Sequence, residues 1–188
     1  MRASGTRPGR TADRPRAGEQ GKDPQMPDTP EGRLQQLGIV LPEQLPVLAT
    51  YRLARRHRDI VYLAGHVSAT LDGRDLIRGK AGAGLTLGQA QEAARTCALH
   101  MLSTLRAEIG SLDQVGQILK VFGMVNVAPG FADGAAGVHL ASVLDGCANQ
   151  LTEIFGSDAG IPARVAVGMA ELPLGAAVET EMTVALHH

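Results

Sequence analysis

Aromatic residues are scarce in this sequence: they make up 3% of it, and tryptophan is absent. Proteins that bind single-stranded nucleic acid stack the bases on aromatic side chains, so this shortage argues against that function. Charge of one sign is also lacking, because 18 Lys and Arg residues nearly balance 19 Asp and Glu residues and leave a formal net charge of -1. Such a chain offers no broad basic surface to a phosphate backbone. We therefore expect no nucleic-acid partner.

Cysteines and long apolar runs are equally sparse. Cys97 and Cys147 are the two cysteines of the chain, too few for a disulfide framework and without the spacing of metal ligands, so we expect both to be buried as small apolar residues. No apolar run approaches the roughly 20 residues that span a bilayer. Residues 1–30 carry arginines without the apolar core of a secretory signal. These absences predict a cytoplasmic protein with no membrane partner.

The composition changes near residue 30. Residues 1–30 are rich in Gly, Pro, Arg and Asp and contain almost no large apolar side chain. Such a segment cannot bury enough surface to offset its ordering entropy. We expect a disordered N-terminal extension over 1–30 and a single folded domain over 31–188.

Hydrophobic periodicity predicts two long helices and five strands within that domain. Thr86 and Gln89 form a capping box at the start of the first long helix, and Gly110 ends it. A short helix over 33–37 precedes these elements, and 71–84 is expected to be a glycine-rich loop. The predicted order is strands 51–56 and 59–67, helix 86–109, strand 118–127, helix 138–155, and strands 164–171 and 177–186.

The order is thus β-β-α-β-α-β-β, which indicates an α+β fold. The two long helices each carry one apolar stripe, so we expect them to pack on one face of a mixed sheet. The other face then needs a cover, and burial against further copies of the chain is the simplest one. Around Pro173-Leu174-Gly175 we expect a hairpin that pairs the last two strands.

Several familiar site motifs are missing. The sequence has no phosphate loop or dinucleotide fingerprint, and Lys80 precedes the glycines that a nucleotide cradle would place before it. His57, His66, His100 and His139 lack the spacing of metal ligands, so we expect neither a metal nor a cofactor. His66 is more typical of a hydrogen-bonded strand residue than of a catalytic base.

Two charged residues near the C-terminus are candidates for chemistry. Arg164 introduces the apolar strand Val165-Ala166-Val167, and its planar guanidinium is suited to binding a carboxylate through two hydrogen bonds. Glu179 alternates with Glu181, so both side chains should lie on one face of a strand. By spacing alone, a solvated strand end and a solvated acidic face remain open as alternatives.

The same residues resemble a known family. The stretch from Pro162 to Pro173, with a small residue before Arg164, an apolar strand and Leu-Pro, followed by Glu179 after a short turn, is similar to the C-terminal signature of the Rid/YjgF family, the reactive intermediate deaminases. Tyr51 and the pair Ala64-Gly65 stand where that family has Tyr and Ser-Gly. The resemblance covers roughly residues 51–185 and is closest to a divergent subgroup.

This resemblance implies a chorismate-mutase-like fold assembled as a homotrimer with clefts between subunits. It implies hydrolysis of reactive enamines and imines, such as 2-aminoacrylate, to 2-keto acids and ammonia, with Arg164 binding the substrate carboxylate and Glu179 positioning water. Tyr51, Ala64 and Gly65 would line the cleft. The chain departs from the family at Ala64, where the usual Ser hydroxyl is missing, and at Thr180, and the family's cleft Asn has no secure counterpart.

The expected hairpin bears on this site. If Leu172 pairs with Ala177, Glu179 lies opposite Ala170, about 20 Å along the strand from Arg164, so the two could cooperate only across a subunit boundary. Two further functions remain open: non-catalytic binding of a small carboxylate or carbonyl metabolite in the same clefts, and RNA cleavage, which the charge and aromatic content disfavour.

Overall fold

The computed structural model describes residues 28–44, 46, 47, 49–131 and 139–188. The sheet order is β1-β2-β7-β5-β6, in which β5 and β6 are parallel and the other neighbours antiparallel. Its strands are β1 (Ala54–His57), β2 (Ile60–Val67), β5 (Val115–Asn126), β6 (Ala163–Met169) and β7 (Val178–Leu186). The expected N-terminal extension over 1–30 lies outside the described residues except for its last three, of which Thr29 caps the first helix and Pro30 begins it.

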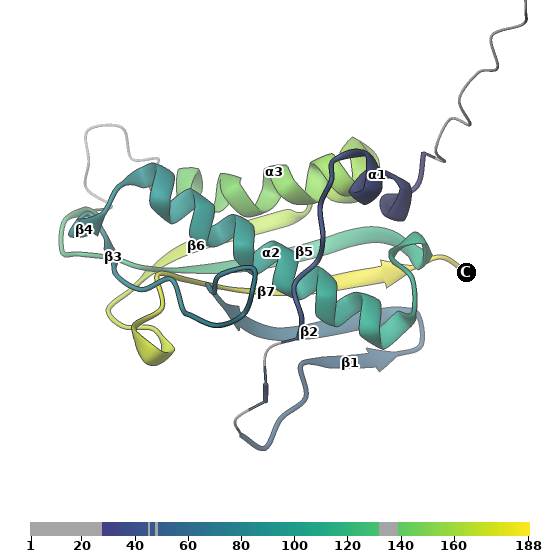
Figure 1. Ribbon diagram of the computed structural model, residues 1–188, viewed down its shortest axis with the longest axis horizontal. Coiled ribbons are helices and arrows are strands. Elements are labelled where there is room, and N and C mark those ends of the chain that lie inside the picture. The colour runs from purple at the N-terminus through teal and green to yellow at the C-terminus, as the bar shows by residue number, and fades with distance from the viewer. Residues whose placement is uncertain (1–27, 45, 48, 132–138) are drawn as a thin grey trace, which may run out of the picture.

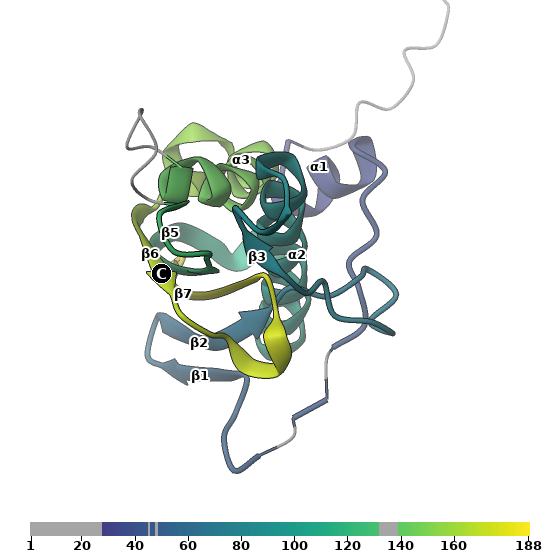
Figure 2. The ribbon, with the colours of Figure 1, turned by 90° about the vertical axis from the view of Figure 1, so that its left-hand side faces the viewer.

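The helices lie on one side of this sheet, as Figure 2 shows. They are α1 (Pro30–Gln36), α2 (Leu87–Ile109) and α3 (His139–Gly160) (Figure 1). The α+β class and the two long helices on one face are confirmed. None of the described helices has the length and apolarity needed to cross a membrane.

The ends of α2 follow directly from the sequence. The Thr86 side chain accepts a hydrogen bond from the Gln89 backbone N–H, and the Gln89 side chain accepts one from the Thr86 backbone N–H. At the other end, Gly110 ends the helix at φ 90°. In α3 the helical geometry breaks at Gly156, where φ is 78°, close to the end expected at Phe155. The short α1 begins at Pro30 with Thr29 as its N-cap, slightly earlier than expected.

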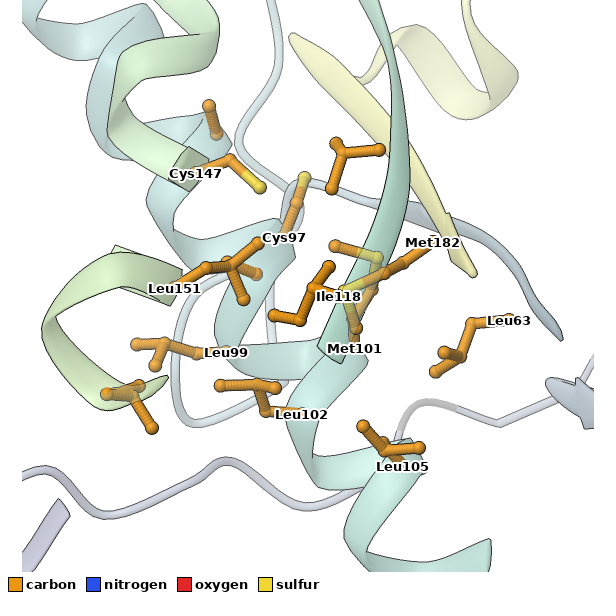
Figure 3. Packing of buried hydrophobic residues seen from close by; sticks show 14 of the residues in the cluster. Leu63, Cys97, Leu99, Met101, Leu102, Leu105, Ile118, Cys147, Leu151 and Met182 are labelled. Atoms are coloured by element: carbon orange, nitrogen blue, oxygen red, sulfur yellow. The ribbon is translucent and has the colours of Figure 1, made fainter. Parts of the chain in front are cut away.

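The core lies between the helices and the covered face of the sheet. Leu99, Met101 and Leu102 of α2 are completely buried, and Leu151 of α3 meets them from the neighbouring helix (Figure 3). Cys97 and Cys147 are free, completely buried thiols in this layer, as expected. Burial raises the pKa of Cys147 to about 12, so this thiol stays protonated and serves as packing.

Two expectations about connections were wrong. β6 and β7 are not paired: each pairs with β5, which lies between them. The reason is that α3 returns the chain to a position parallel to β5, as a β-α-β crossover does, so β7 must take the other side of β5. The segment Pro173–Gly175 is a 3₁₀ turn between strands that are not neighbours.

The glycine-rich segment 71–84 also contains structure that was not expected. Its last residues form the short parallel ladder of β3 (Lys80–Ala81) and β4 (Gly84–Leu85). The Lys80 ammonium donates to Asn126 Oδ1 at 2.6 Å and to the Ala170 carbonyl, so it fastens this segment to the sheet.

Candidate active site

A cavity of about 730 Å³ lies beside the middle of β2 and the start of β7. Four residues that the sequence analysis placed in a site line it: Tyr51, Ala64, Gly65 and Glu179. They come from the segment before β1, from β2 and from β7. The remaining walls are mostly apolar and include Leu53, Leu76, Val67, Pro173 and Leu174. Concave apolar sites with a few polar groups are typical of small-molecule binding.

A break in strand pairing shapes this wall. The register between β2 and β7 shifts between Leu63 and His66, so Ala64 and Gly65 form a bulge, and the Ala64 N–H donates to the Leu53 carbonyl at 2.9 Å. A Cβ atom at Gly65 would overlap Oε1 of Glu179 and lie 3.0 Å from its Cδ. The glycine therefore leaves the space that the carboxylate occupies.

Two effects raise the pKa of Glu179 above its usual range. Burial is the larger one, since it removes water from the carboxylate, and repulsion from Glu181 adds to it. A carboxylate with a raised pKa accepts a proton more readily near neutral pH than an exposed one. Glu181 lies on the same face of β7, as expected from their alternation, but is exposed.

The His66 side chain links the bulge at Ala64 to helix α2. It is 2% exposed, its Nδ1 lies 2.8 Å from the Ala64 carbonyl, and its Nε2 lies 2.8 Å from Oγ1 of Thr104 on α2. Burial lowers the pKa of His66, which favours the neutral ring. The expectation of a hydrogen-bonded strand residue is confirmed, since both ring nitrogens have partners.

Arg164 lies elsewhere, at the start of β6. Its partner on β5 is Val121, whose side chain is buried under the helices, so Arg164 points to the covered face of the sheet. There its Nη1 donates to Asp145 Oδ1 of α3 at 2.9 Å. The pair stays within reach of solvent, because the side chains of Arg164 and Asp145 are 22% and 46% exposed.

Arg164 and Glu179 therefore do not meet within one chain. Their partners on β5, Val121 and Met124, are three residues apart, which places the two side chains on opposite faces. Two strand spacings and three residues separate their Cα atoms by about 14 Å. The sequence-based distance rested on the wrong hairpin, although the two residues are separated in both cases.

Comparisons with known proteins agree with this fold. No family model matches the chain. Protein TCP17 of Trypanosoma cruzi is 35% identical over 162 residues, which cover 82% of this chain and 92% of that protein. A solved structure from Shewanella oneidensis MR-1, described as a candidate endoribonuclease, has 27% identity and a TM-score of 0.75, covering 84% of this chain and 99% of that one.

A third similar structure is Escherichia coli TdcF, solved with bound serine. It shares the fold at 16% identity with a TM-score of 0.51, covering 78% of this chain and 94% of TdcF. The signature from Pro162 to Glu179 and these matches agree. The chain belongs to the Rid/YjgF superfamily.

By the resemblance noted in its sequence, this Rid/YjgF protein has Ala64 where the family has a serine hydroxyl. Ala64 sits in the bulge and lines the cavity, so the missing hydroxyl leaves a purely apolar side chain there. Tyr51 also lines the cavity but lies in a turn before β1, which begins only at Ala54, and not on the strand expected over 51–56. Its side chain is 49% exposed.

The cavity of this Rid/YjgF chain is also lined by a cationic side chain that the sequence did not predict there. Arg78 lines it, and its Nε donates to the Leu174 carbonyl at 3.1 Å. Only the fold brings Arg78 there, through a bridge to Ala176 that no local sequence pattern announces. Among the described residues, no group of three or more His, Cys, Asp or Glu side chains could hold a metal ion.

Proposed function

We propose that this protein hydrolyses reactive enamines and imines of the 2-aminoacrylate kind to 2-keto acids and ammonia, without a metal or a cofactor. The observation that carries the proposal is the Glu179 carboxylate, held beside Gly65 in the wall of a mostly apolar cavity, with its pKa raised by burial. Binding of serine by TdcF, which shares the fold, supports a small amino-acid-like ligand.

Hydrolysis of an imine requires few catalytic groups. Protonation of the imine nitrogen makes its carbon electrophilic, and water then adds to give a carbinolamine. The carbon–nitrogen bond breaks, ammonia leaves, and a carbonyl remains. Glu179 aims the attacking water and accepts its proton, because a carboxylate with a raised pKa suits both tasks.

In this proposal, Arg164 binds the substrate carboxylate from a neighbouring subunit of a homotrimer. Two observations support this arrangement. β6 is an edge strand of the sheet, and Arg164 keeps part of its surface exposed, so a neighbouring copy can reach it. In addition, no described helix covers the sheet face that carries Glu179, Phe122 and Met124. Asp145 then fixes the orientation of the guanidinium and leaves other donors of its fork for the ligand.

The direct test generates an imine in situ from a neutral amino acid with an oxidase and follows its decay against a chemical trap. We expect acceleration by the protein and a loss of about 1000-fold in Glu179→Gln, in line with the loss of a general base. Glu181→Gln is the matched control, since it lies on the same strand and face but is exposed. Equal rates with and without the protein would refute the enzyme.

Mixing two inactive variants tests the shared site. Glu179→Gln and Arg164→Gln subunits, co-expressed in equal amounts, should regain activity in about a quarter of the clefts, because each cleft needs one intact residue from each of two subunits. If both residues acted within one chain, no activity would return. The oligomeric state, measured by light scattering, is expected to be a trimer.

The second candidate is a non-catalytic protein that binds small carboxylate or carbonyl metabolites in the same cavity. The specific observation in its favour is Ala64, which removes a hydroxyl from the cavity wall. Titration with 2-keto acids, followed by calorimetry, separates the two candidates. Tight binding without acceleration of imine decay would favour the binding protein.

A further inference from the structure

The Arg78 guanidinium, which lines the Glu179 cavity, has no anionic partner within the described part of the chain. The arginine ion pairs among the described residues, such as Arg74 with Asp72 and Arg164 with Asp145, do not include Arg78. Arg78 is exposed at the wall of this mostly apolar cavity, so its guanidinium can bind a ligand that brings its own negative charge.

The side chain of Arg78 is held by the fold. Its backbone bridges to Ala176, and the Ala177 N–H donates to the Ile77 carbonyl at 2.8 Å. Leu174, at φ 57° in the left-handed region, accepts from Arg78 Nε at 3.1 Å. Because Nε is used in this way, the paired Nη groups remain for a carboxylate, which they can bind through two parallel hydrogen bonds.

Arg78 and Glu179 occupy separate parts of the same wall. Val67 pairs with Glu179, whereas Arg78 bridges to Ala176, three residues earlier in the chain. Three residues of extended chain span about 10 Å. The carboxylate of a 2-imino acid is bonded directly to the imine carbon, so a carbon placed at Glu179 leaves Arg78 to a second, more distant group of the substrate.

We propose, on the basis of the function proposed above, that Arg78 binds a side-chain carboxylate of the substrate. The preferred substrates are then 2-imino dicarboxylates, the imines that form when acidic amino acids are oxidised. The reaction remains balanced: one water is consumed, the carbon–nitrogen double bond becomes a carbonyl, and ammonia leaves with a 2-keto dicarboxylate as the other product.

The test compares two imines generated in situ, one from glutamate and one from norvaline, which has a similar length but no side-chain charge. For Arg78→Gln we expect kcat/KM to fall about 100-fold with the glutamate imine and less than about threefold with the norvaline imine. Arg78→Lys should recover part of the loss. Arg74→Gln is the matched control, because Arg74 lies in the same loop and is exposed, as Arg78 is, but does not line the cavity.

The outcomes separate the two proposals. Equal losses with both imines, or no loss with either, would overturn the role of Arg78 while the enzyme stands. If the wild-type protein accelerates neither reaction, the proposed function fails, and binding decides the fate of Arg78. In that case 2-oxoglutarate should bind at least about tenfold more tightly than 2-oxopentanoate, and Arg78→Gln should remove the difference. Equal affinities would contradict the inference.

Discussion

Along β7, successive side chains alternate between two very different surroundings. Val178, Thr180 and Met182 are buried beneath the helices. Glu179 and Glu181 point the other way, toward a face that no described helix covers. One strand thus supplies both the core and the carboxylate of the candidate site. For β7, the comparison teaches that changes to its covered face should act on stability, and changes to its uncovered face on chemistry.

The largest expected effect tests the covered face. Leu151→Ala leaves a cavity between α3 and α2 and should lower the free energy of unfolding by about 2–5 kcal/mol, measured by urea denaturation. Its activity per folded molecule should stay unchanged. Val167→Ala on the uncovered face of β6 is the control, and its cost should depend on protein concentration if neighbouring copies bury it. Equal, concentration-independent costs would break the comparison.

The next prediction concerns the uncovered face. In Gly65→Ala the new methyl group takes the place of the Glu179 carboxylate, which is the far end of a flexible side chain and can move aside. We expect the rate of imine hydrolysis to fall about 100-fold through misplacement of the carboxylate, while the melting temperature changes little. A large drop in melting temperature would show that Gly65 serves the fold and not the site.

Acidification should lower the stability of the fold through its two buried histidines, His66 and His100. Burial lowers the pKa values of His66 and His100 below the usual 6.5. As the pH falls below 6.5, the unfolded chain therefore binds protons at these residues more readily than the folded chain does. The contribution of these two histidines to the free energy of unfolding is therefore fully present above pH 6.5. It falls as the pH drops below 6.5, by at most about 1.4 kcal/mol per pH unit for each histidine. The measurement is urea denaturation between pH 7.5 and 5.5.

Two variants identify the groups responsible. His66→Gln should reduce this dependence and leave the part that belongs to His100. The same substitution at His57, which is exposed on the edge strand β1, should leave the dependence as it is in the wild type. A slope that His66→Gln does not change would assign the effect to other groups.

The smallest expected effect is a change in a pH profile. Repulsion from Glu181 contributes to the raised pKa of Glu179. Glu181→Gln removes that repulsion, so the acidic limb of the activity profile should move to lower pH, with the maximal rate changed less than about twofold. A limb that stays in place would show that burial alone sets the proton affinity of Glu179.

The sequence predicted the local structure far better than the neighbours of each strand. The limits of α2 were clear because Thr86, Gln89 and Gly110 act through contacts within a few residues. The pairing of β6 and β7 was wrong because a turn sequence such as Pro173-Leu174-Gly175 does not determine which strands lie side by side. That arrangement depends on the crossover through α3.

The candidate site shows the same division. Tyr51, Ala64, Gly65 and Glu179 could be named through the family resemblance, and the structure brings them to one cavity. The role of Asp145 beside Arg164 could not, because the two meet only where α3 packs over β6. Arg78 carries no motif at all, so only the bridge to Ala176 shows that it lines the cavity.

The position of α1 has a consequence for the order of folding. Arg33 donates from Nη1 to the Ile154 carbonyl at 3.3 Å, across 121 residues of sequence, just before the break at Gly156. Glu31 accepts from Arg106 and from the Leu112 N–H, which also lie far along the chain. α1 is therefore the first of the described helices to be synthesised, but its contact with Ile154 can form only after the chain has been synthesised through α3.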